Sequence, residues 1–249
     1  MVPLSTAELL AVWERGLEKG PLERALALLE AACPDSPPAV LASLSVGRRD
    51  AALLTLREWA FGHEMTGSAI CANCGQSVEM TLDTSYLRLH STDSAAPPEV
   101  SLATAGCEIR LRPPNSSDLM ACAAVDATEI PKQLFASCLL AASMQGKPVS
   151  AEELPAEVVQ AGIEQMAQAD RQANLEIDIS CSGCGHRWIE VFDIVSFFWT
   201  EIDAWARRML REVHVLASAY GWSEKEILLL NPRRRHSYLE MAMHEQLSY

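Results

Sequence analysis

The chain has 249 residues, of which 49% are apolar and 21% charged, and its 20 basic and 33 acidic residues give a net charge of −13. This length predicts one large or two small domains with a hydrophobic core, and the composition disfavours disordered, collagen-like and long coiled-coil proteins. The negative charge would repel a phosphate backbone, which disfavours nucleic acid as a partner and favours proteins.

The sequence disfavours both a membrane span and a secretion signal. A spanning helix needs about 18 apolar residues or more, whereas the best apolar run, Ile194–Trp199, is closed by Asp193 and Glu201. The opening MVPLSTAELL has no basic region before its short apolar run, unlike a signal peptide. We therefore expect a cytoplasmic protein without a membrane partner.

Residues 1–66 are predicted to form an N-terminal helical region. Ser5 and Glu8 have the spacing of a capping box, which begins a first helix. Pro21 suits the first turn of a second helix. A third helix is predicted from about Arg48 to Ala60, after a proline-rich break.

Residues 67–192 are predicted to hold a small antiparallel sheet with a helical insertion over about 113–170. Four segments have the two-residue period of a half-buried strand, and they are Val78–Leu82, Cys107–Leu111, Leu175–Ile179 and Ile189–Val191. Helical periodicity occurs between the second and third strands, near Ser117–Ala124, Ile130–Ser143 and Leu154–Ala169. Residues 91–98 (STDSAAPP) are predicted to form an exposed loop.

Residues 193–249 are predicted to form a long helix and a helical tail. Apolar residues recur at steps of three and four from Asp193 to Tyr220. Ser223 and Glu226 form a capping box for a short helix, and Asn231 before a proline suits the start of a final helix. The predicted fold class is therefore α+β, mainly α-helical, with N- and C-terminal helices flanking the sheet.

Two pairs of cysteines carry the strongest chemical signal. Cys71 and Cys74 belong to one C-x-x-C-G motif, and Cys181 and Cys184 belong to another. Such a turn directs two sulfur atoms to one side, and the following glycine can adopt the positive φ that the turn often needs. Without an export signal the thiols stay reduced, so we predict that these cysteines bind one structural Zn²⁺ in a four-cysteine zinc ribbon.

The predicted site is more extended in sequence than a compact ribbon. A stretch of 106 residues separates Cys74 from Cys181, against about 15 to 20 in compact sites. The metal would therefore link distant parts of the chain. Four thiolates fill a tetrahedral shell and leave no position for a catalytic water. The sequence also lacks nucleophile, phosphate-binding and dinucleotide motifs, so we predict no catalytic residues and no enzymatic activity.

His186 and four further cysteines are not assigned to the metal. His186 follows the second pair, but four cysteines suffice as ligands, which favours a position beside the site or in solvent. The other cysteines lack partner spacing and are expected to fill the core, and they are Cys33, Cys107, Cys122 and Cys138.

The C-terminal region contains candidate partner-binding residues. Three consecutive arginines begin the predicted final helix, where cations oppose the helix macrodipole. They should therefore meet acidic groups, either of this acidic protein or of a partner. The aromatic residues of this region are either core or interface. The residues assigned to partner binding are Trp199, Trp205, Trp222, Arg233, Arg234 and Arg235.

Several segments taken together resemble a known family. They are Val46-Gly47-Arg48-Arg49-Asp50 with Leu56-Arg57-Glu58, the two C-x-x-C-G motifs, Phe198-Trp199-x-Glu201-Ile202 and Pro232-Arg233-Arg234-Arg235. With these motifs the chain resembles the T-even-phage-like baseplate hub assembly chaperones, as found in contractile phage-tail-like injection systems. Segment Tyr220–Tyr238 is also similar to short phage tail assembly proteins, in which a Trp-Ser-x-x-Glu-Ile-Leu pattern precedes an arginine-rich helix.

The resemblance implies a non-enzymatic assembly factor, or chaperone, that binds proteins of the baseplate or hub. A minor structural component that stays in the baseplate is one alternative. A nucleic-acid-binding regulator built on the zinc ribbon is another, although the charge of −13 and the few basic residues around the cysteines weigh against it.

Overall fold

The computed structural model describes residues 1–89 and 99–246 and divides the chain into two compact units. The terminal unit combines Met1–Pro34 with Val195–Tyr249, and the central unit is Asp35–Ile194. The loop predicted over 91–98 lies outside the described residues. The division into residues 1–66, 67–192 and 193–249 describes the order of elements along the chain. It stays a prediction. None of the described helices is long and apolar enough to cross a membrane.

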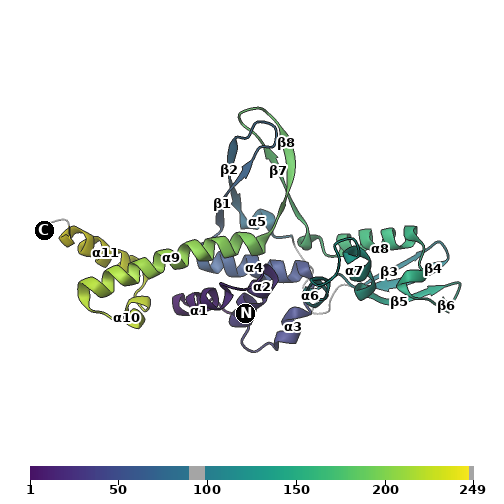
Figure 1. The fold of residues 1–249 in the computed structure, drawn as a ribbon, viewed down its shortest axis with the longest axis horizontal. Coiled ribbons are helices and arrows are strands. Elements are labelled where there is room, and N and C mark those ends of the chain that lie inside the picture. Colours follow the sequence, from purple (N-terminus) through teal and green to yellow (C-terminus); the bar gives the residue numbers. More distant parts are fainter. Residues whose placement is uncertain (90–98, 247–249) are drawn as a thin grey trace. The chain divides into compact units, whose positions relative to one another are not determined.

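The terminal unit is helical, and local signals set where its helices begin. Ser5 donates its backbone N–H to the Glu8 carboxylate at 2.8 Å, so the predicted capping box is confirmed. Ser223 and Glu226 form the second one, and Asn231 accepts a backbone hydrogen bond in the first turn of the last helix. The helices are α1 (Thr6–Gly16), α2 (Pro21–Ala32), α9 (Ile194–Tyr220), α10 (Glu224–Leu228) and α11 (Pro232–Gln246) (Figure 1).

A tryptophan of α9 packs against a glycine of α1. A Cβ at Gly16 would lie 2.2 Å from a ring atom of Trp199, so a larger residue would displace the ring. Arg24 of α2 lies over the same ring, 4.6 Å from its centroid. Trp13 donates a hydrogen bond from Nε1 to Asp203 at 2.9 Å. Helices α1, α2 and α9 therefore share one core, and Trp199 is buried in it.

In its described residues, the central unit combines helices with three antiparallel sheets. Its helices are α3 (Pro38–Ala42), α4 (Val46–Phe61), α5 (Thr84–Leu87), α6 (Ser116–Cys122), α7 (Ile130–Cys138) and α8 (Ala156–Ala169), with 3₁₀ turns η1 (Ala151–Glu153) and η2 (Arg171–Ala173). Its strands are β1 (Glu64–Ile70), β2 (Ser77–Asp83), β3 (Val100–Thr104), β4 (Cys107–Leu111), β5 (Leu139–Met144), β6 (Lys147–Pro148), β7 (Leu175–Ser180) and β8 (Arg187–Phe192) (Figure 1).

The mixed α+β class with small antiparallel sheets is confirmed, but the predicted single sheet and purely helical insertion are wrong. The cysteine hairpins β1–β2 and β7–β8 are separate two-stranded sheets, and β4 belongs to the four-stranded sheet β3-β4-β5-β6. The predicted helix Ile130–Ser143 ends at Cys138, after which β5 begins. Pairing with β4 directs Ala142 and Met144 toward a core shared with α7 and α8. This tertiary packing overrides the helical propensity of the Leu-Leu-Ala-Ala run.

Gly47 and Asp170 hold the start of α4 against the chain that follows α8. The N–H of Gly47 donates to the Asp170 carboxylate at 2.9 Å, so a negative charge meets the positive end of the helix. A Cβ at Gly47 would lie 2.3 Å from Asp170 Oδ1, which explains the glycine. Nearby, burial raises the pKa of Asp50, although its ion pair with Arg49 at 2.7 Å opposes this change. Asp170 therefore holds the first turn of α4 in place within the central unit.

Two tight turns in the four-stranded sheet place non-glycine residues at positive φ. In the first two-residue loop, φ is 49° at Ala105 and 70° at Gly106. In the second, φ is 51° at Gln145 and 75° at Gly146. Positive φ at both positions is typical of type I′ turns, which favour Asn-Gly. We expect Ala105→Asn to raise the free energy of unfolding by roughly 0.5 to 1 kcal/mol, because alanine is strained in this conformation and asparagine tolerates it.

Ala105→Val is the opposing control, since a β-branched residue is disfavoured at positive φ. Urea unfolding of the two variants should give changes of opposite sign. A stability change of the same sign in both would contradict the assignment of strain to this turn.

Candidate metal centre

The four cysteines lie at the tips of two hairpins. Strands β1 and β2 pair antiparallel up to Ile70↔Ser77, and β7 and β8 pair up to Ser180↔Arg187. Each C-x-x-C-G motif forms the turn that directly follows these last pairs. The pairing within each hairpin therefore fixes the position of its two thiols at the tip of that hairpin.

The two turns have the same backbone geometry. In the first, the N–H of Cys71 donates to the carbonyl of Gln76 at 2.9 Å, and the N–H of Gly75 donates to the carbonyl of Cys71 at 2.8 Å. The second turn repeats both bonds, at 2.8 and 2.9 Å. Gly75 and Gly185 both have φ of 74°, so the predicted positive φ is confirmed.

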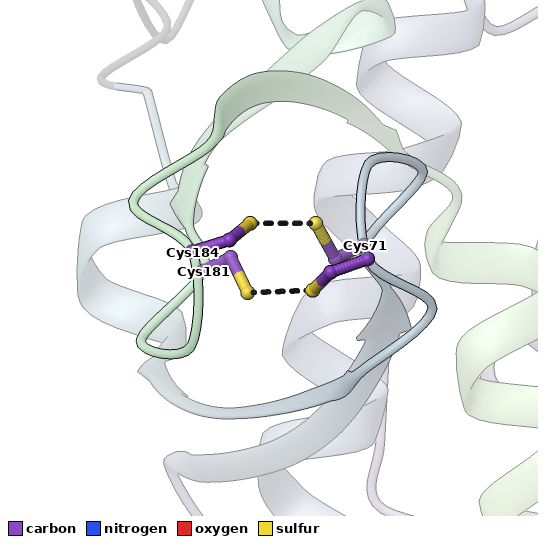
Figure 2. Close-up of side chains that lie close together, drawn as sticks. Cys71, Cys181 and Cys184 are labelled. Carbon is purple, nitrogen blue, oxygen red and sulfur yellow. Dashed lines mark hydrogen bonds between the residues drawn. The ribbon is translucent and has the colours of Figure 1, made fainter.

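The hairpin tips bring all four sulfur atoms together. Cys71 Sγ lies 3.7 Å from Cys184 Sγ, and Cys74 Sγ lies 3.6 Å from Cys181 Sγ; the dashed lines in Figure 2 mark both contacts. All four Sγ atoms lie within 4.8 Å of one another. A tetrahedral site with metal–sulfur bonds of 2.3 Å has sulfur–sulfur edges of about 3.8 Å. The arrangement therefore fits a single metal ion.

Neighbouring groups shift the ionisation of these thiols in opposite directions. The Asn73 side-chain amide donates to Cys184 Sγ at 3.5 Å and is the main cause that lowers the pKa of Cys184 to about 6. The backbone hydrogen bond from Gln76 lowers the pKa of Cys74, but hydrogen bonds with Cys184 and Cys181 outweigh it and raise this pKa to about 12. Four thiolates this close repel one another, so a cation is needed for all four to ionise.

The donor set limits what a metal could do here. Four thiolates in a tetrahedron are typical of Zn²⁺ or iron–sulfur sites, and they leave no coordination position for water. Among the described residues, these cysteines are the one group of three or more metal-binding side chains close enough to share an ion. A metal bound here would link two hairpins that are far apart in sequence, which is a structural role.

A buried arginine, which the sequence identified only as part of a family motif, connects α4 to the first hairpin. Arg57 is 2% exposed. It donates from Nη1 to the carbonyl of Gly62 at 2.7 Å and from Nη2 to the carbonyl of Glu64 at 2.8 Å. No local pattern distinguishes an arginine that binds backbone carbonyls from a solvated one. Its role therefore follows only from the tertiary structure.

The remaining candidates for metal ligation lie outside the sulfur cluster. His186 stacks on Trp188, with ring centroids 5.7 Å apart. Cys107, Cys122 and Cys138 are buried, as expected for core residues, and Cys33 is half-buried.

The three tryptophans predicted to bind a partner differ in exposure. Trp199 is only 7% exposed, because α1 and α2 cover it. Trp222 is half-buried and stacks on Tyr220 at a centroid distance of 4.7 Å, and Tyr238 meets it edge-on at 4.8 Å. Trp205 is also half-buried. At least Trp199 and Trp222 therefore have intramolecular packing roles.

The three arginines at the start of α11 also differ. Arg235 is 5% exposed and donates from Nε to Glu212 of α9 at 2.8 Å and from Nη1 to the carbonyl of Leu230. Arg233 and Arg234 are exposed. Of the two interpretations left open by the sequence, intramolecular pairing applies to Arg235, whereas the other two cations face solvent.

Comparison with known proteins identifies one family. A family model described as T4 bacteriophage base plate protein matches residues 8–199, roughly three quarters of the chain, including both cysteine pairs. No curated protein and no solved structure gave a match. Because the match covers most of the chain, this protein belongs to the T4 bacteriophage base plate protein family.

Proposed function

We propose that the protein is a non-enzymatic assembly factor that acts in the cytoplasm and binds baseplate or hub proteins of a contractile phage-tail-like injection system. The observation that carries this proposal is the family match over residues 8–199. The closed four-thiolate arrangement supports a non-catalytic role for the metal site. Protein binding is then the activity that remains for an acidic, baseplate-related protein.

We infer further that the metal is a single structural Zn²⁺ held by Cys71, Cys74, Cys181 and Cys184, whose Sγ atoms lie within 4.8 Å of one another. Zinc prefers tetrahedral thiolate sites and supplies folding free energy without redox chemistry. In this role it stabilises the two hairpins of the central unit, one following α4 and the other preceding α9.

A minor structural baseplate component is the main alternative, and the family match supports it equally. The two differ in one property, because an assembly factor leaves the particle and a structural component stays. A nucleic-acid-binding regulator has less support, since the chain carries a net charge of −13.

Deleting the gene in cells that assemble the particle, followed by electron microscopy and mass spectrometry of purified particles, tests this function. We expect deletion to leave few complete particles, and we expect wild-type particles to lack the protein. Re-expression of the wild type should restore assembly, and Cys33→Ser, which lies outside the sulfur cluster, should do so equally well. Normal particles after deletion would contradict the proposal, and a fixed stoichiometry in mature particles would favour the structural alternative.

A further inference from the structure

Four exposed arginines lie on α9 and α11, within four residues in sequence of the ion pair that joins these two helices. Figure 1 shows α11 beside the C-terminal half of α9, and Arg235 of α11 binds Glu212 of α9 at 2.8 Å. Arg233 and Arg234 directly precede Arg235. On α9, two further arginines lie within one helical turn before Glu212. We call the four exposed residues the arginine patch, and they are Arg208, Arg211, Arg233 and Arg234.

The arginine patch lacks acidic partners within the described part of the chain, although the protein has an excess of acidic residues. No ion pair or side-chain hydrogen bond of its four guanidinium groups occurs among the described residues, whereas Arg187 and Arg207, which are also exposed, each bind a carboxylate. Residues 195–249 carry seven basic and seven acidic residues, so the net charge of −13 resides entirely in residues 1–194. Positive charge is thus concentrated on two adjacent helices of an otherwise acidic protein.

Stability does not explain this concentration of charge. Arg233 and Arg234 lie in the first turn of α11, where cations oppose the macrodipole and acidic residues would stabilise the helix by a few tenths of a kcal/mol each or more. Glu212, the carboxylate between the two helices, already binds the buried Arg235. Charges that cost stability and have no internal partner are typical of binding surfaces.

We propose that the arginine patch docks a short acidic segment of a baseplate or hub protein. This inference rests on the proposed function and specifies the surface and the chemistry of its partner. Met241 lies two helical turns after Arg234 on the same face of α11 and is 48% exposed, so it offers an apolar contact beside the cations. The patch lies outside the family match, which ends at residue 199.

An acidic protein segment fits the patch better than nucleic acid does. Screening limits electrostatic interactions to about 8 Å at physiological ionic strength, so a short acidic segment meets mainly the four arginines. A longer phosphate backbone would extend past the patch toward a protein with a net charge of −13 and would be repelled. The arginine side chain also binds carboxylates in a bidentate manner.

The test measures binding of the purified full-length protein to each purified baseplate and hub subunit encoded with it, and to a short DNA duplex, at low and physiological ionic strength. We expect one acidic subunit to bind, and we expect Arg233→Glu with Arg234→Glu to weaken this binding about tenfold or more and to reduce its salt dependence. Arg208→Glu with Arg211→Glu should act in the same direction. Replacing acidic residues of the partner segment by lysine should restore binding to the variant.

Arg15→Glu with Arg171→Glu is the matched control, because both arginines are exposed, lie elsewhere on α1 and η2 and give the same change of net charge. It should leave binding unchanged. Thermal unfolding excludes misfolding as a cause, since glutamates at the start of α11 should keep or raise the melting temperature.

The outcomes separate the two proposals. If a subunit binds wild type, patch variants and control alike, the docking surface is wrong and the proposed function stands. If no subunit binds, and the DNA duplex binds wild type but not the patch variants, the patch binds nucleic acid and the proposed acidic protein segment is wrong. If no subunit binds and deletion leaves particles normal, the proposed function fails as well.

Discussion

Cys181→Ser is expected to abolish binding of one zinc per chain and to destabilise the central unit strongly. Binding of structural zinc to such sites contributes roughly 10 to 16 kcal/mol, whereas the net stability of a domain is only about 5 to 15 kcal/mol. Loss of the metal therefore removes a contribution as large as the whole stability. The cysteine hairpins should be affected most, because each is an isolated two-stranded sheet, which is marginally stable in water on its own.

Elemental analysis, thermal unfolding and amide hydrogen exchange together measure this effect. Exchange should become fast in β1, β2, β7 and β8, whereas β4 should keep protection because its side chains belong to a separate buried cluster. Cys33→Ser is the control, since its thiol lies outside the sulfur cluster. Purified protein without zinc, or an unchanged melting temperature after strong chelation, would overturn the assignment of the site.

Arg57→Met is expected to lower the free energy of unfolding of the central unit by about 3 kcal/mol or more. The substitution removes two hydrogen bonds from a charged donor, each worth about 1.5 to 3 kcal/mol. It also leaves the carbonyls of Gly62 and Glu64 without these donors. Urea unfolding at saturating zinc measures the change independently of metal binding.

Arg110→Met provides the comparison for Arg57. The Arg110 side chain is 57% exposed and pairs with Glu99, which is 52% exposed, and exposed ion pairs contribute about 1 kcal/mol or less. We expect Arg57→Lys to be intermediate, because an ammonium keeps the charge but lacks the fork that reaches both carbonyls. Equal losses of stability in the Arg57 and Arg110 variants would show that the buried contacts of Arg57 contribute little.

Signals carried by a few neighbouring residues were read correctly from the sequence. The capping residues Ser5, Ser223 and Asn231 begin the helices predicted for them. Gly75 and Gly185 adopt the positive φ expected after each cysteine pair. Local spacing also identified the four cysteines whose sulfur atoms the structure brings together, because a C-x-x-C turn determines the direction of its own two thiols without help from the rest of the fold.

Contacts between distant segments were decided only by the tertiary structure. Leu139–Met144 has a helical pattern, yet it forms β5, whose pairing with β4 packs Leu139, Ala142 and Met144 against a buried core. Arg233 and Arg235 belong to the same run of three arginines, and the sequence did not distinguish them. Only Arg235 forms an ion pair with Glu212, whereas Arg233 is exposed. Strand pairing and ion pairing of this kind depend on which distant segments the fold brings into contact. A single sequence gives only local periodicity, which does not identify these contacts. The sequence thus determined local turns, caps and thiol pairs, whereas packing and pairing across the chain decided burial, sheet membership and which charges stay exposed.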